Sequence, residues 1–353
     1  MSRLEPYLPV IVALIALVGF VTLASAAPDE SYVTRQLIWF VVGLVGCVAL
    51  FWIGGARLEK LTLPLYLVTL VLLVAVLVFG EEINGAKRWL DLGPARVQPS
   101  ELAKIALILL LGRYLSQPSS RGWLSYLVVA GVVGLPTLLV LMGPDLGSAM
   151  VIAAIGAGML FVRGVPTRLL VASMALVLVT VPLVVPRLAP HQQSRITAFL
   201  NPDADPQGSG YQVTQARIAI GSGGLTGKGW RQGTQTQLDF IPFKHTDFIF
   251  PVLAEELGFV GSGFVLVLFA LLFWRLAVMA MECPRPRDQL VISGVLAYLG
   301  FQTLVNVGVS LGLAPVTGLT LPIVSYGGTN LVITLGALGL AVLVHRDRFR
   351  GFS

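Results

Sequence analysis

The chain has 353 residues, of which 56% are hydrophobic and only 12% are charged. Soluble domains carry about 25% charged residues, so the composition excludes an ordinary soluble protein, a disordered chain and a disulfide scaffold. The 24 Lys and Arg residues against 18 Asp and Glu leave a net charge of +6. In a membrane protein such an excess belongs to cytoplasmic loops. We therefore predict a polytopic membrane protein and no nucleic-acid partner.

Apolar runs of about 17–25 residues, the length that crosses a bilayer as a helix, recur along the whole chain. They predict an all-α integral membrane protein of ten transmembrane helices, with residues 1–353 forming a single transmembrane domain. The fourth and sixth runs are short, and the eighth is long enough to tilt. The predicted spans are 8–26, 36–53, 61–79, 102–115, 124–142, 146–162, 168–186, 248–274, 289–311 and 328–345.

The first run ends at Ala24-Ser25-Ala26, which is similar to a signal-peptidase site. Its beginning does not suit a signal peptide, because Glu5 accompanies Arg3 and two prolines, Pro6 and Pro9, follow. We therefore expect the first span to be retained in the mature protein.

The positions of Lys and Arg predict the orientation, because cytoplasmic connections are enriched in both. One set of connections is short and nearly all positive: Arg57, Lys60, Arg113, Arg121, Arg163, Arg168, Arg275, Arg285, Arg287, Arg346, Arg348 and Arg350. The other set is mixed in sign: Asp29, Glu30, Arg35, Glu81, Glu82, Lys87, Arg88 and Asp91. We predict that both termini are cytoplasmic and that Cys47 and Cys283 are free thiols.

Three connections are predicted to be more than plain loops. Residues 80–101 contain charges, a tryptophan and two prolines, and about 187–247 form one large extracytoplasmic loop. Loops of that length are usually functional or disordered, and the aromatic residues spread through this one predict order. The segment 312–327 is apolar but interrupted by Pro and Gly, so it has to be shielded by protein or line a cavity. We interpret it as re-entrant.

Carboxylates near the start of the eighth span are candidates for chemistry. Asp247 lies near the external membrane face, where partial desolvation would raise its pKa and suit it to take a proton from a sugar hydroxyl. The alternative is a helix N-cap. Glu255 and Glu256 lie within the span and are expected to face a cavity or a partner, with a structural ion pair as the alternative.

Basic side chains of the external segments predict a cationic surface that suits a diphosphate at the outer leaflet. Trp89 beside them is equally consistent with an interfacial anchor. Ser100 is placed to cap the fourth span, and Glu101 with Lys104 at i,i+3 spacing is alternatively a structural ion pair. The predicted surface consists of Lys87, Arg88, Lys104, Arg195 and Arg217.

Two glycine-containing segments have simpler interpretations. Asp145 in 143–148 (GPDLGS) is first of all an N-cap in a tight turn. The stretch 221–229 (GSGGLTGKG) lacks the P-loop pattern, because Ser222 and Gly229 replace the required Gly and Ser or Thr. It is interpreted as an external turn, although stacked backbone N–H groups would also suit a phosphate. With only three histidines and no metal-ligand spacing, no metal site is predicted.

The chain resembles the SEDS family (shape, elongation, division and sporulation) over essentially its whole length. The strongest match is the C-terminal signature formed by Asn306, 312–315 (GLAP), Gly318 and 323–329 (IVSYGGT). Asn330 departs from it, since the family has Ser or Ala there, and 233–235 (GTQ) is more similar to the elongation branch. Further matches are 86–89 (AKRW), 98–101 (QPSE) with Lys104, 144–147 (PDLG), 245–250 (HTDFIF) and 254–258 (AEELG).

The resemblance implies a peptidoglycan glycosyltransferase of the bacterial cytoplasmic membrane that polymerises lipid II on the outer face. It implies a class B penicillin-binding protein and other membrane proteins of the elongation complex as partners. Asp247 matches the essential aspartate of the family and is assigned as the catalytic residue. The residues assigned to substrate binding are Arg88, Trp89, Ser100, Glu101, Lys104, Asp145, Arg195, His245, Thr246, Glu255 and Ser325.

Conversion of an α-linked sugar diphosphate into a β-1,4 link implies inversion, which needs one base on the acceptor hydroxyl. The diphosphate leaving group needs cations, supplied by arginine and lysine alone or with a divalent cation such as Mg²⁺ or Mn²⁺. Two alternatives stay open at this point. One is a lipid II flippase, and the other is a non-catalytic scaffold that activates a penicillin-binding protein.

Overall fold

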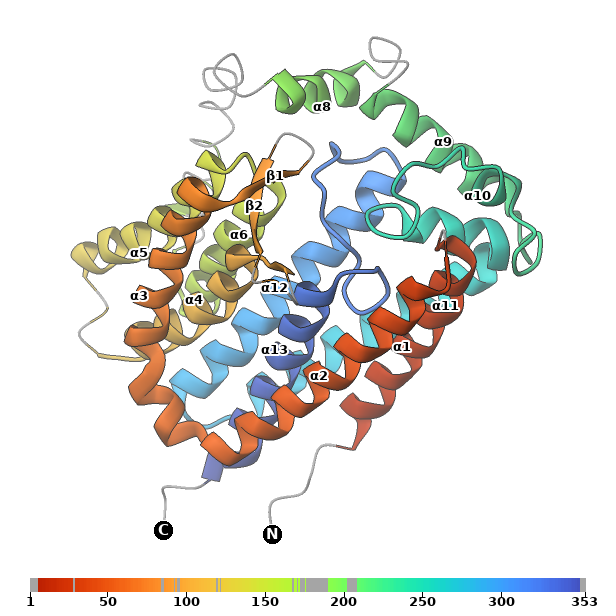
Figure 1. Cartoon of the computed structure of the whole chain (residues 1–353). Coiled ribbons are helices and arrows are strands. Elements are labelled where there is room, and N and C mark those ends of the chain that lie inside the picture. The colour runs from red at the N-terminus through yellow and green to blue at the C-terminus, as the bar shows by residue number, and fades with distance from the viewer. Residues whose placement is uncertain are drawn as a thin grey trace.

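The computed structural model describes residues 6–27, 29–83, 86–91, 93, 96–118, 120, 122–166, 168–169, 171, 175, 190–201 and 208–349. Helices dominate this part of the chain (Figure 1), and the all-α membrane architecture is confirmed. Helices occupy nine of the ten predicted spans, and the seventh, 168–186, falls mostly outside the described residues. These helices are α1 (Tyr7–Ala26), α2 (Ser31–Ile53), α3 (Gly55–Phe79), α4 (Pro99–Leu115), α5 (Trp123–Met142), α6 (Leu146–Val162), α11 (Ile249–Met281), α12 (Pro286–Ser310) and α13 (Gly328–Arg346).

Seven of these helices are long and apolar enough to cross a membrane: α1, α2, α3, α5, α11, α12 and α13. The helix α6 is a shorter apolar helix of 17 residues. Several helices begin before the predicted spans, as α3 does at Gly55, with Arg57 and Lys60 in its first turns. Long basic side chains extend along a helix to reach water, so a charged residue does not mark the helix end.

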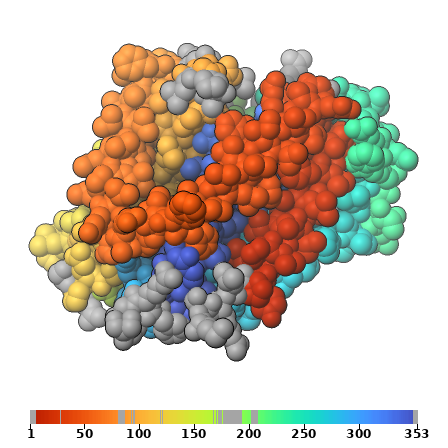
Figure 2. Space-filling view, turned by 60° about the horizontal axis from the view of Figure 1, so that its bottom comes forward, coloured from red at the N-terminus to blue at the C-terminus, as the bar shows by residue number. Residues whose placement is uncertain are grey.

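The helix α12 is the centre of the bundle, packed against α4, α6, α11 and α13. Its most apolar stretch is 61% buried, whereas that of α2 is 11% buried. The helices α1 and α2 cover α11 and α13 respectively, and Figure 2 shows the N-terminal helices as an outer face with α13 visible between them. A peripheral helix with so little buried surface has an apolar face that suits lipid.

Smaller elements cover the end of the bundle opposite the start of α1 and the end of α13 (Figure 1). The strands β1 (Glu81–Ile83), β2 (Ala86–Asp91) and β3 (Arg96–Val97) form an antiparallel sheet in the order β1-β2-β3. The described parts of the large loop contain three short helices, α8 (Pro190–Leu200), α9 (Ser209–Ser222) and α10 (Thr234–Gln237). A short 3-10 helix, η3 (Asp347–Phe349), follows α13.

The glycine-rich stretch 221–229 is not a phosphate loop. It packs against a break in α11 at Gly258, where φ is 67° and ψ is −165°, and its N–H groups are used within the fold. A Cβ at Gly227 would collide with the backbone of Glu256, so the close approach requires glycine. The hydrogen bonds across the break are Lys228 N to Glu255 O, Gly229 N to Glu256 O, Phe259 N to Gly224 O and Val260 N to Leu225 O.

The segment between α12 and α13 is non-helical, and most of its residues from Val316 to Ser325 are buried, as the prediction of a shielded, broken segment requires. Gln302 of α12 donates from Nε2 to the carbonyl of Thr320 at 2.9 Å. Gln36 of α2 donates to the carbonyl of Ser325 at 2.9 Å. Side-chain amides thus satisfy backbone groups that have no regular partner, as buried irregular backbone requires.

Candidate active site

Side chains from three separate segments converge on Gly318 in the broken segment. A Cβ built at Gly318 would lie 3.5 Å from Arg88 Nη1, 3.8 Å from Arg195 Nη1 and 3.8 Å from Asp247 Oδ2. Gly318 has φ of +77°, a conformation that side chains with a Cβ rarely adopt. The strand β2 supplies Arg88, α8 supplies Arg195, and Asp247 lies directly before α11. A carboxylate and two guanidinium groups therefore share one small space.

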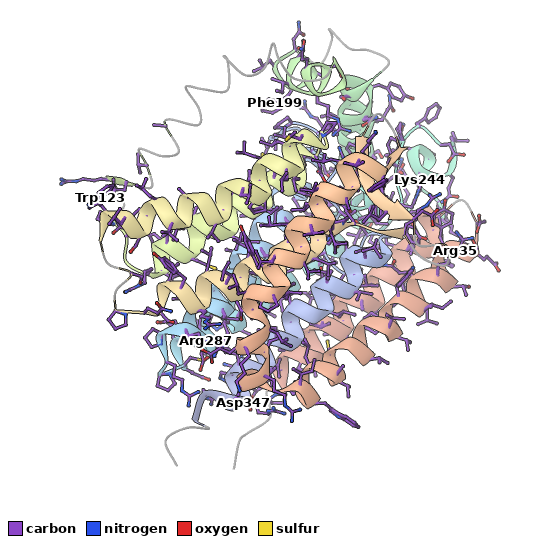
Figure 3. The ribbon with its side chains drawn as sticks, turned by 60° about the vertical axis from the view of Figure 1, so that its left-hand side comes forward. Arg35, Trp123, Phe199, Lys244, Arg287 and Asp347 are labelled. Carbon is purple, nitrogen blue, oxygen red and sulfur yellow. The ribbon has the colours of Figure 1, made fainter. Side chains whose placement is uncertain are left out.

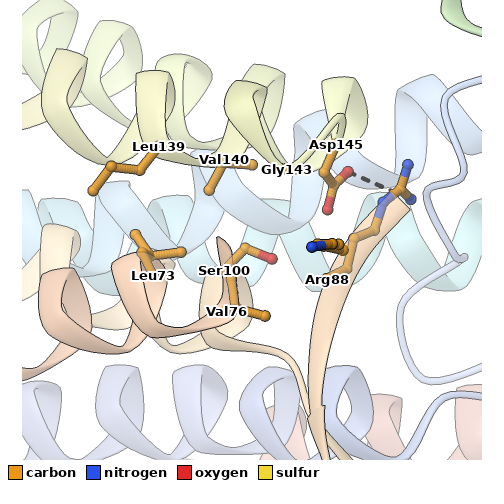
Figure 4. Close-up of a pocket in the computed structure, with 9 residues that line it drawn as sticks. Leu73, Val76, Arg88, Ser100, Leu139, Val140, Gly143 and Asp145 are labelled. Carbon is orange, nitrogen blue, oxygen red and sulfur yellow. Dashed lines mark ion pairs between the residues drawn. The ribbon is translucent and has the colours of Figure 1, made fainter. Parts of the chain in front are cut away.

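Arg88 is held by the turn before α6. Its Nη2 donates to the carbonyl of Pro144 at 2.7 Å, and its Nη1 lies 3.7 Å from Asp145 Oδ1 (Figure 4). Asp145 caps α6, as predicted, by accepting from Ser148 N at 3.1 Å, and its Oδ2 accepts from Gln98 Nε2 at 3.1 Å. The buried Nε of Arg88 has no partner among the described residues. Arg88 therefore keeps donor capacity for an anion.

A small cavity of about 10 Å³ lies beside Arg88 and Asp145 (Figure 4). It has room for about one water molecule. One part is polar and the other is formed by apolar side chains of α3 and α5. Its lining is Leu73, Val76, Lys87, Arg88, Ser100, Leu139, Val140, Gly143 and Asp145.

Asp247 does not cap α11, so the N-cap alternative is wrong. Phe248 occupies the N-cap position and no side chain caps the helix. Within the described part of the chain, the Asp247 carboxylate has no hydrogen-bond partner, and Arg195 and Arg88 act on it through space. Burial disfavours the charged form and outweighs both guanidinium groups, raising the pKa of Asp247 from 3.8 to about 6. A carboxylate with this pKa is a suitable base near neutral pH.

The backbone before Asp247 is fastened to the broken segment. Ser325 Oγ donates to the carbonyl of Thr246 at 2.6 Å, and Tyr326 N donates to the carbonyl of His245 at 2.9 Å. The ring of His245 packs edge-on against Tyr32 of α2, with centroids 4.9 Å apart. Burial and Lys244 lower the pKa of His245, which favours a neutral imidazole. Ser325 and His245 therefore support the position of Asp247.

Lys104 does not belong to the predicted cationic surface. It is fully buried, and its Nζ lies 2.6 Å from Glu101 Oε1, so the structural ion pair is correct. Lys104 also donates to Gln302 Oε1 at 3.3 Å and lies over the ring of Tyr298. Asn330, the residue that departs from the signature, donates to Glu101 Oε2 at 3.0 Å. A charge at this depth has to be paired, and Glu101 is the partner that allows Lys104 to point inward.

Glu255 forms a structural ion pair, which was the alternative named for it. Its Oε1 lies 2.7 Å from Lys228 Nζ and accepts from Gln235 N at 2.9 Å. Its Oε2 accepts from the N and Oγ1 of Thr236 at 3.0 and 2.8 Å. Glu256 accepts hydrogen bonds from Ser25 and Gln237. Glu255 and Glu256 thus connect the large loop between α6 and α11 to α11 and α1.

The other predicted residues have different surroundings. Ser100 does not cap α4, because Gln98 holds the N-cap position, but Ser100 does line the cavity beside Arg88. Trp89 is half-buried in β2, paired opposite Glu81. Lys87 and Arg217 are exposed, and Arg217 lies against Gly312 rather than Gly318.

Sequence reasoning missed roles for three residues. Gly318 forms the floor of the site, Gln98 holds Asp145, and Asn306 of α12 donates to the carbonyl of Asp247. Gly318 and Asn306 lie within the signature, which was the only available signal. Hydropathy places both in or beside a span and says nothing of their contacts.

The comparisons with known proteins all find one family. The family model FTSW_RODA_SPOVE, described as "Cell cycle protein", matches residues 6–349. The peptidoglycan glycosyltransferase MrdB of Escherichia coli K12 is 39% identical over 349 residues, which cover 98% of this chain and 94% of MrdB. The probable peptidoglycan glycosyltransferase FtsW of Thiomicrospira cyclica is 37% identical over 345 residues, covering 92% and 78% respectively.

Two solved structures have the same fold over nearly the whole chain. A chain from a peptidoglycan synthase complex has a TM-score of 0.86 at 43% identity, with 99% of each chain covered. The rod shape determining protein RodA of Thermus thermophilus has a TM-score of 0.76 at 40% identity, with 98% of each chain covered. The SEDS resemblance is thus confirmed: this chain belongs to the cell cycle protein family of FtsW, RodA and SpoVE.

Proposed function

We propose that this chain is a peptidoglycan glycosyltransferase that polymerises lipid II into glycan strands on the outer face of the bacterial cytoplasmic membrane during elongation. The activity follows from relatives named as peptidoglycan glycosyltransferases at up to 39% identity over nearly the whole chain. The observation that carries the mechanism is the Asp247 carboxylate, which has a pKa of about 6 and lies beside two guanidinium groups.

Asp247 is proposed as the general base. The acceptor 4-hydroxyl attacks the anomeric carbon of the donor sugar, a new C–O bond forms, and the bond to the diphosphate breaks with inversion. The hydroxyl proton passes to the Asp247 carboxylate, which has no competing hydrogen bond among the described residues. A base with a pKa near the working pH combines a high deprotonated fraction with useful proton affinity.

Arg88 and Arg195 are proposed to stabilise the leaving diphosphate. Arg88 has an unpartnered Nε, and the Nη1 atoms of both arginines point into the space beside Gly318. Planar guanidinium groups match phosphate oxygens in pairs, and their charge is already in position before the reaction. Asp145 holds Arg88 through the turn before α6.

The side chains that the structure describes do not form a cage for Mg²⁺ or Mn²⁺. The described residues include no group of three His, Cys, Asp or Glu side chains placed to hold a metal ion. Both oxygens of Asp145 accept hydrogen bonds, from Ser148 and Gln98. We propose that the guanidinium groups bind the diphosphate directly, and no step above uses a divalent cation.

A class B penicillin-binding protein is the proposed partner, together with other membrane proteins of the elongation complex. The support is the fold shared with a chain of a complex that coordinates polymerisation and crosslinking, at 43% identity. In such a complex the partner would crosslink the strands that this chain makes.

The test is polymerisation of labelled lipid II by the purified protein, with a class B penicillin-binding protein and penicillin present to block crosslinking. Asp247→Asn is expected to abolish polymer. The matched control is Asp239→Asn, because Asp239 is largely exposed, at 81% of its side chain, and forms an ion pair with Lys244. Size-exclusion profiles and circular dichroism of both variants show whether they fold.

Three outcomes would contradict the proposal. Polymer from Asp247→Asn at the wild-type rate would remove Asp247 as the base. Equal loss in both variants would assign the effect to the loop rather than to the carboxylate. No polymer from wild-type protein, with lipid II crossing the bilayer of proteoliposomes, would favour the flippase instead.

A further inference from the structure

A second cavity, of about 390 Å³, lies between α4, α5 and α6 at the end of the bundle away from Asp247. The helices α4 and α6 begin beside the active site, at Pro99 and Leu146, and both end at this cavity. It therefore has no part in the reaction proposed above. Its lining is Leu115, Ser120, Tyr126, Arg163, Gly164 and Val165.

Arg163 is the charged residue of this cavity's lining, and one of its donors has no partner among the described residues. Its Nε is buried and has no partner in the described part of the chain. Its Nη2 lies 3.5 Å from Ser120 Oγ, at the limit of a hydrogen bond. The Ser120 hydroxyl is itself directed at the carbonyl of Gln117, at 2.6 Å. Buried guanidinium donors usually have acceptors, so the arrangement points to an external one.

The fold explains the charge of Arg163 in part. Arg163 is the C-cap residue of α6, where a cation interacts favourably with the helix dipole. That position does not explain the cavity or the unpartnered Nε. None of the six lining residues is acidic, and Tyr126 adds a hydroxyl to the wall. A cationic, hydroxyl-bearing cavity of this size suits an anion such as a phosphate.

Apolar side chains exposed on α5 continue from the cavity along the outside of the bundle. Trp123 is 70% exposed, Leu124 61% and Leu127 58%. Figure 3 shows Trp123 projecting at the edge of the molecule, on the side away from Arg35 and Lys244. Tryptophan at a helix end marks the membrane–water interface. A phosphate in the cavity would thus have an apolar wall beside it, along which acyl chains can lie.

We propose that this cavity binds the headgroup of an anionic phospholipid of the cytoplasmic leaflet. The phosphate pairs with Arg163, and the acyl chains follow α5. Basic pockets between transmembrane helices on this side of the membrane bind anionic headgroups. The proposal does not depend on the reaction assigned to Asp247.

The test measures lipid retention by native mass spectrometry and thermal stability of the purified full chain. Phosphatidylglycerol is compared with phosphatidylcholine of the same acyl composition. Wild type is expected to retain phosphatidylglycerol preferentially and to gain melting temperature with it alone. Arg163→Gln is expected to lose at least tenfold in apparent affinity, and Tyr126→Phe severalfold. The control is Arg113→Gln, because Arg113 is a cation in the last turn of α4 that donates to the carbonyl of Glu59.

Each arm of the experiment can overturn the proposal. Equal retention of both lipids by wild type would show that the headgroup charge is not recognised. Equal losses in Arg163→Gln and Arg113→Gln would show general attraction to positive charge rather than this site. Stabilisation by inorganic phosphate alone, with no further effect of phosphatidylglycerol, would identify a free anion instead of a lipid. If Arg163→Gln does not fold, Tyr126→Phe carries the comparison.

Discussion

Asn306 holds the backbone of Asp247 from the centre of the bundle. Its Nδ2 donates to the carbonyl of Asp247 at 2.8 Å and to the carbonyl of Leu319 at 2.7 Å. One buried amide of α12 therefore joins the segment before α11 to the broken segment beside Gly318. Together with the hydrogen bonds from Ser325 and Tyr326 to the carbonyls of Thr246 and His245, this side chain sets the distance between Asp247 and Gly318.

Replacing Asn306 with Ala is expected to lower kcat about 100-fold while changing KM little, because a base displaced by about 1 Å loses that much rate. The two carbonyls left without a donor would also cost about 1–3 kcal/mol each in stability. The measurement is lipid II polymerisation against substrate concentration. Ser293→Ala is the control on the same helix, since it removes only a hydroxyl bond to the carbonyl of Gln289. Similar kcat values for both variants would refute the positioning role.

The pH dependence of polymerisation should follow Asp247. Its pKa is raised to about 6, so the carboxylate is protonated below that pH and cannot accept the hydroxyl proton. We expect kcat/KM to fall about tenfold per pH unit below 6 and to be level above about 7. Initial rates between pH 4.5 and 8 test this. Full activity down to pH 4.5 would mean that the base has an ordinary carboxylate pKa.

The same raised pKa predicts that Asp247 destabilises the folded protein at neutral pH. The unfolded chain ionises near 3.8 and the folded one at about 6, so the penalty is absent below pH 3.8, grows between these values and is full above pH 6. Its upper limit is about 3 kcal/mol. Asp247→Asn should therefore raise the melting temperature at pH 8 but not at pH 4. A lower melting temperature at pH 8 would show that the arginines stabilise the charged form.

The Gly318→Ala variant tests whether a methyl group at this position obstructs the site or only strains the backbone. Gly312 is the matched control, because it has φ of +74° in the same segment but faces Arg217 instead of Asp247. Each alanine should cost about 1–3 kcal/mol through its positive φ. Only the methyl at position 318 would lie within 4 Å of Asp247 and of both guanidinium groups, so only that variant should lose about tenfold or more in kcat/KM. Equal activity losses would assign both effects to strain.

The Glu101–Lys104 pair is expected to act in stability. Lys104→Met leaves a buried carboxylate without its cation and should cost about 3–5 kcal/mol, whereas Glu101→Gln with Lys104→Met should recover most of that loss. Thermal unfolding in detergent measures both variants. Polymerisation should recover with stability in the double variant. A double variant that is stable but inactive would instead show that Lys104 contacts substrate.

The positions of the membrane helices were predictable because hydropathy is a local property. The described helices match nine predicted spans within several residues, and the broken segment before α13 was evident from its prolines and glycines. The break in α11 at Gly258 and the three strands were not predicted. The break depends on a partner distant in sequence, the loop at Gly227 that packs against it, whereas the strands pair with their immediate neighbours in the chain.

The candidate site was predictable only in part. Asp247, Arg88, Arg195 and Asp145 were identified from motifs and from the charge of the external segments, and the structure brings them together. Lys104 carries the same charge and was assigned to the same surface, yet it is buried against Glu101. Charge and spacing show which residues can bind an anion. They do not show which of them point outward.

The sequence by itself determined the membrane class, the approximate limits of the described helices, and the family through a long C-terminal signature. These properties depend on composition and on neighbouring residues. Only the tertiary structure decided which charges are available, because availability depends on what packs against each side chain. Glu255 is enclosed by Lys228 and Thr236, whereas Asp247 keeps a carboxylate without a hydrogen bond among the described residues. Both carboxylates lose contact with water. Glu255 gains hydrogen-bond partners in exchange, whereas the Asp247 carboxylate gains none among the described residues.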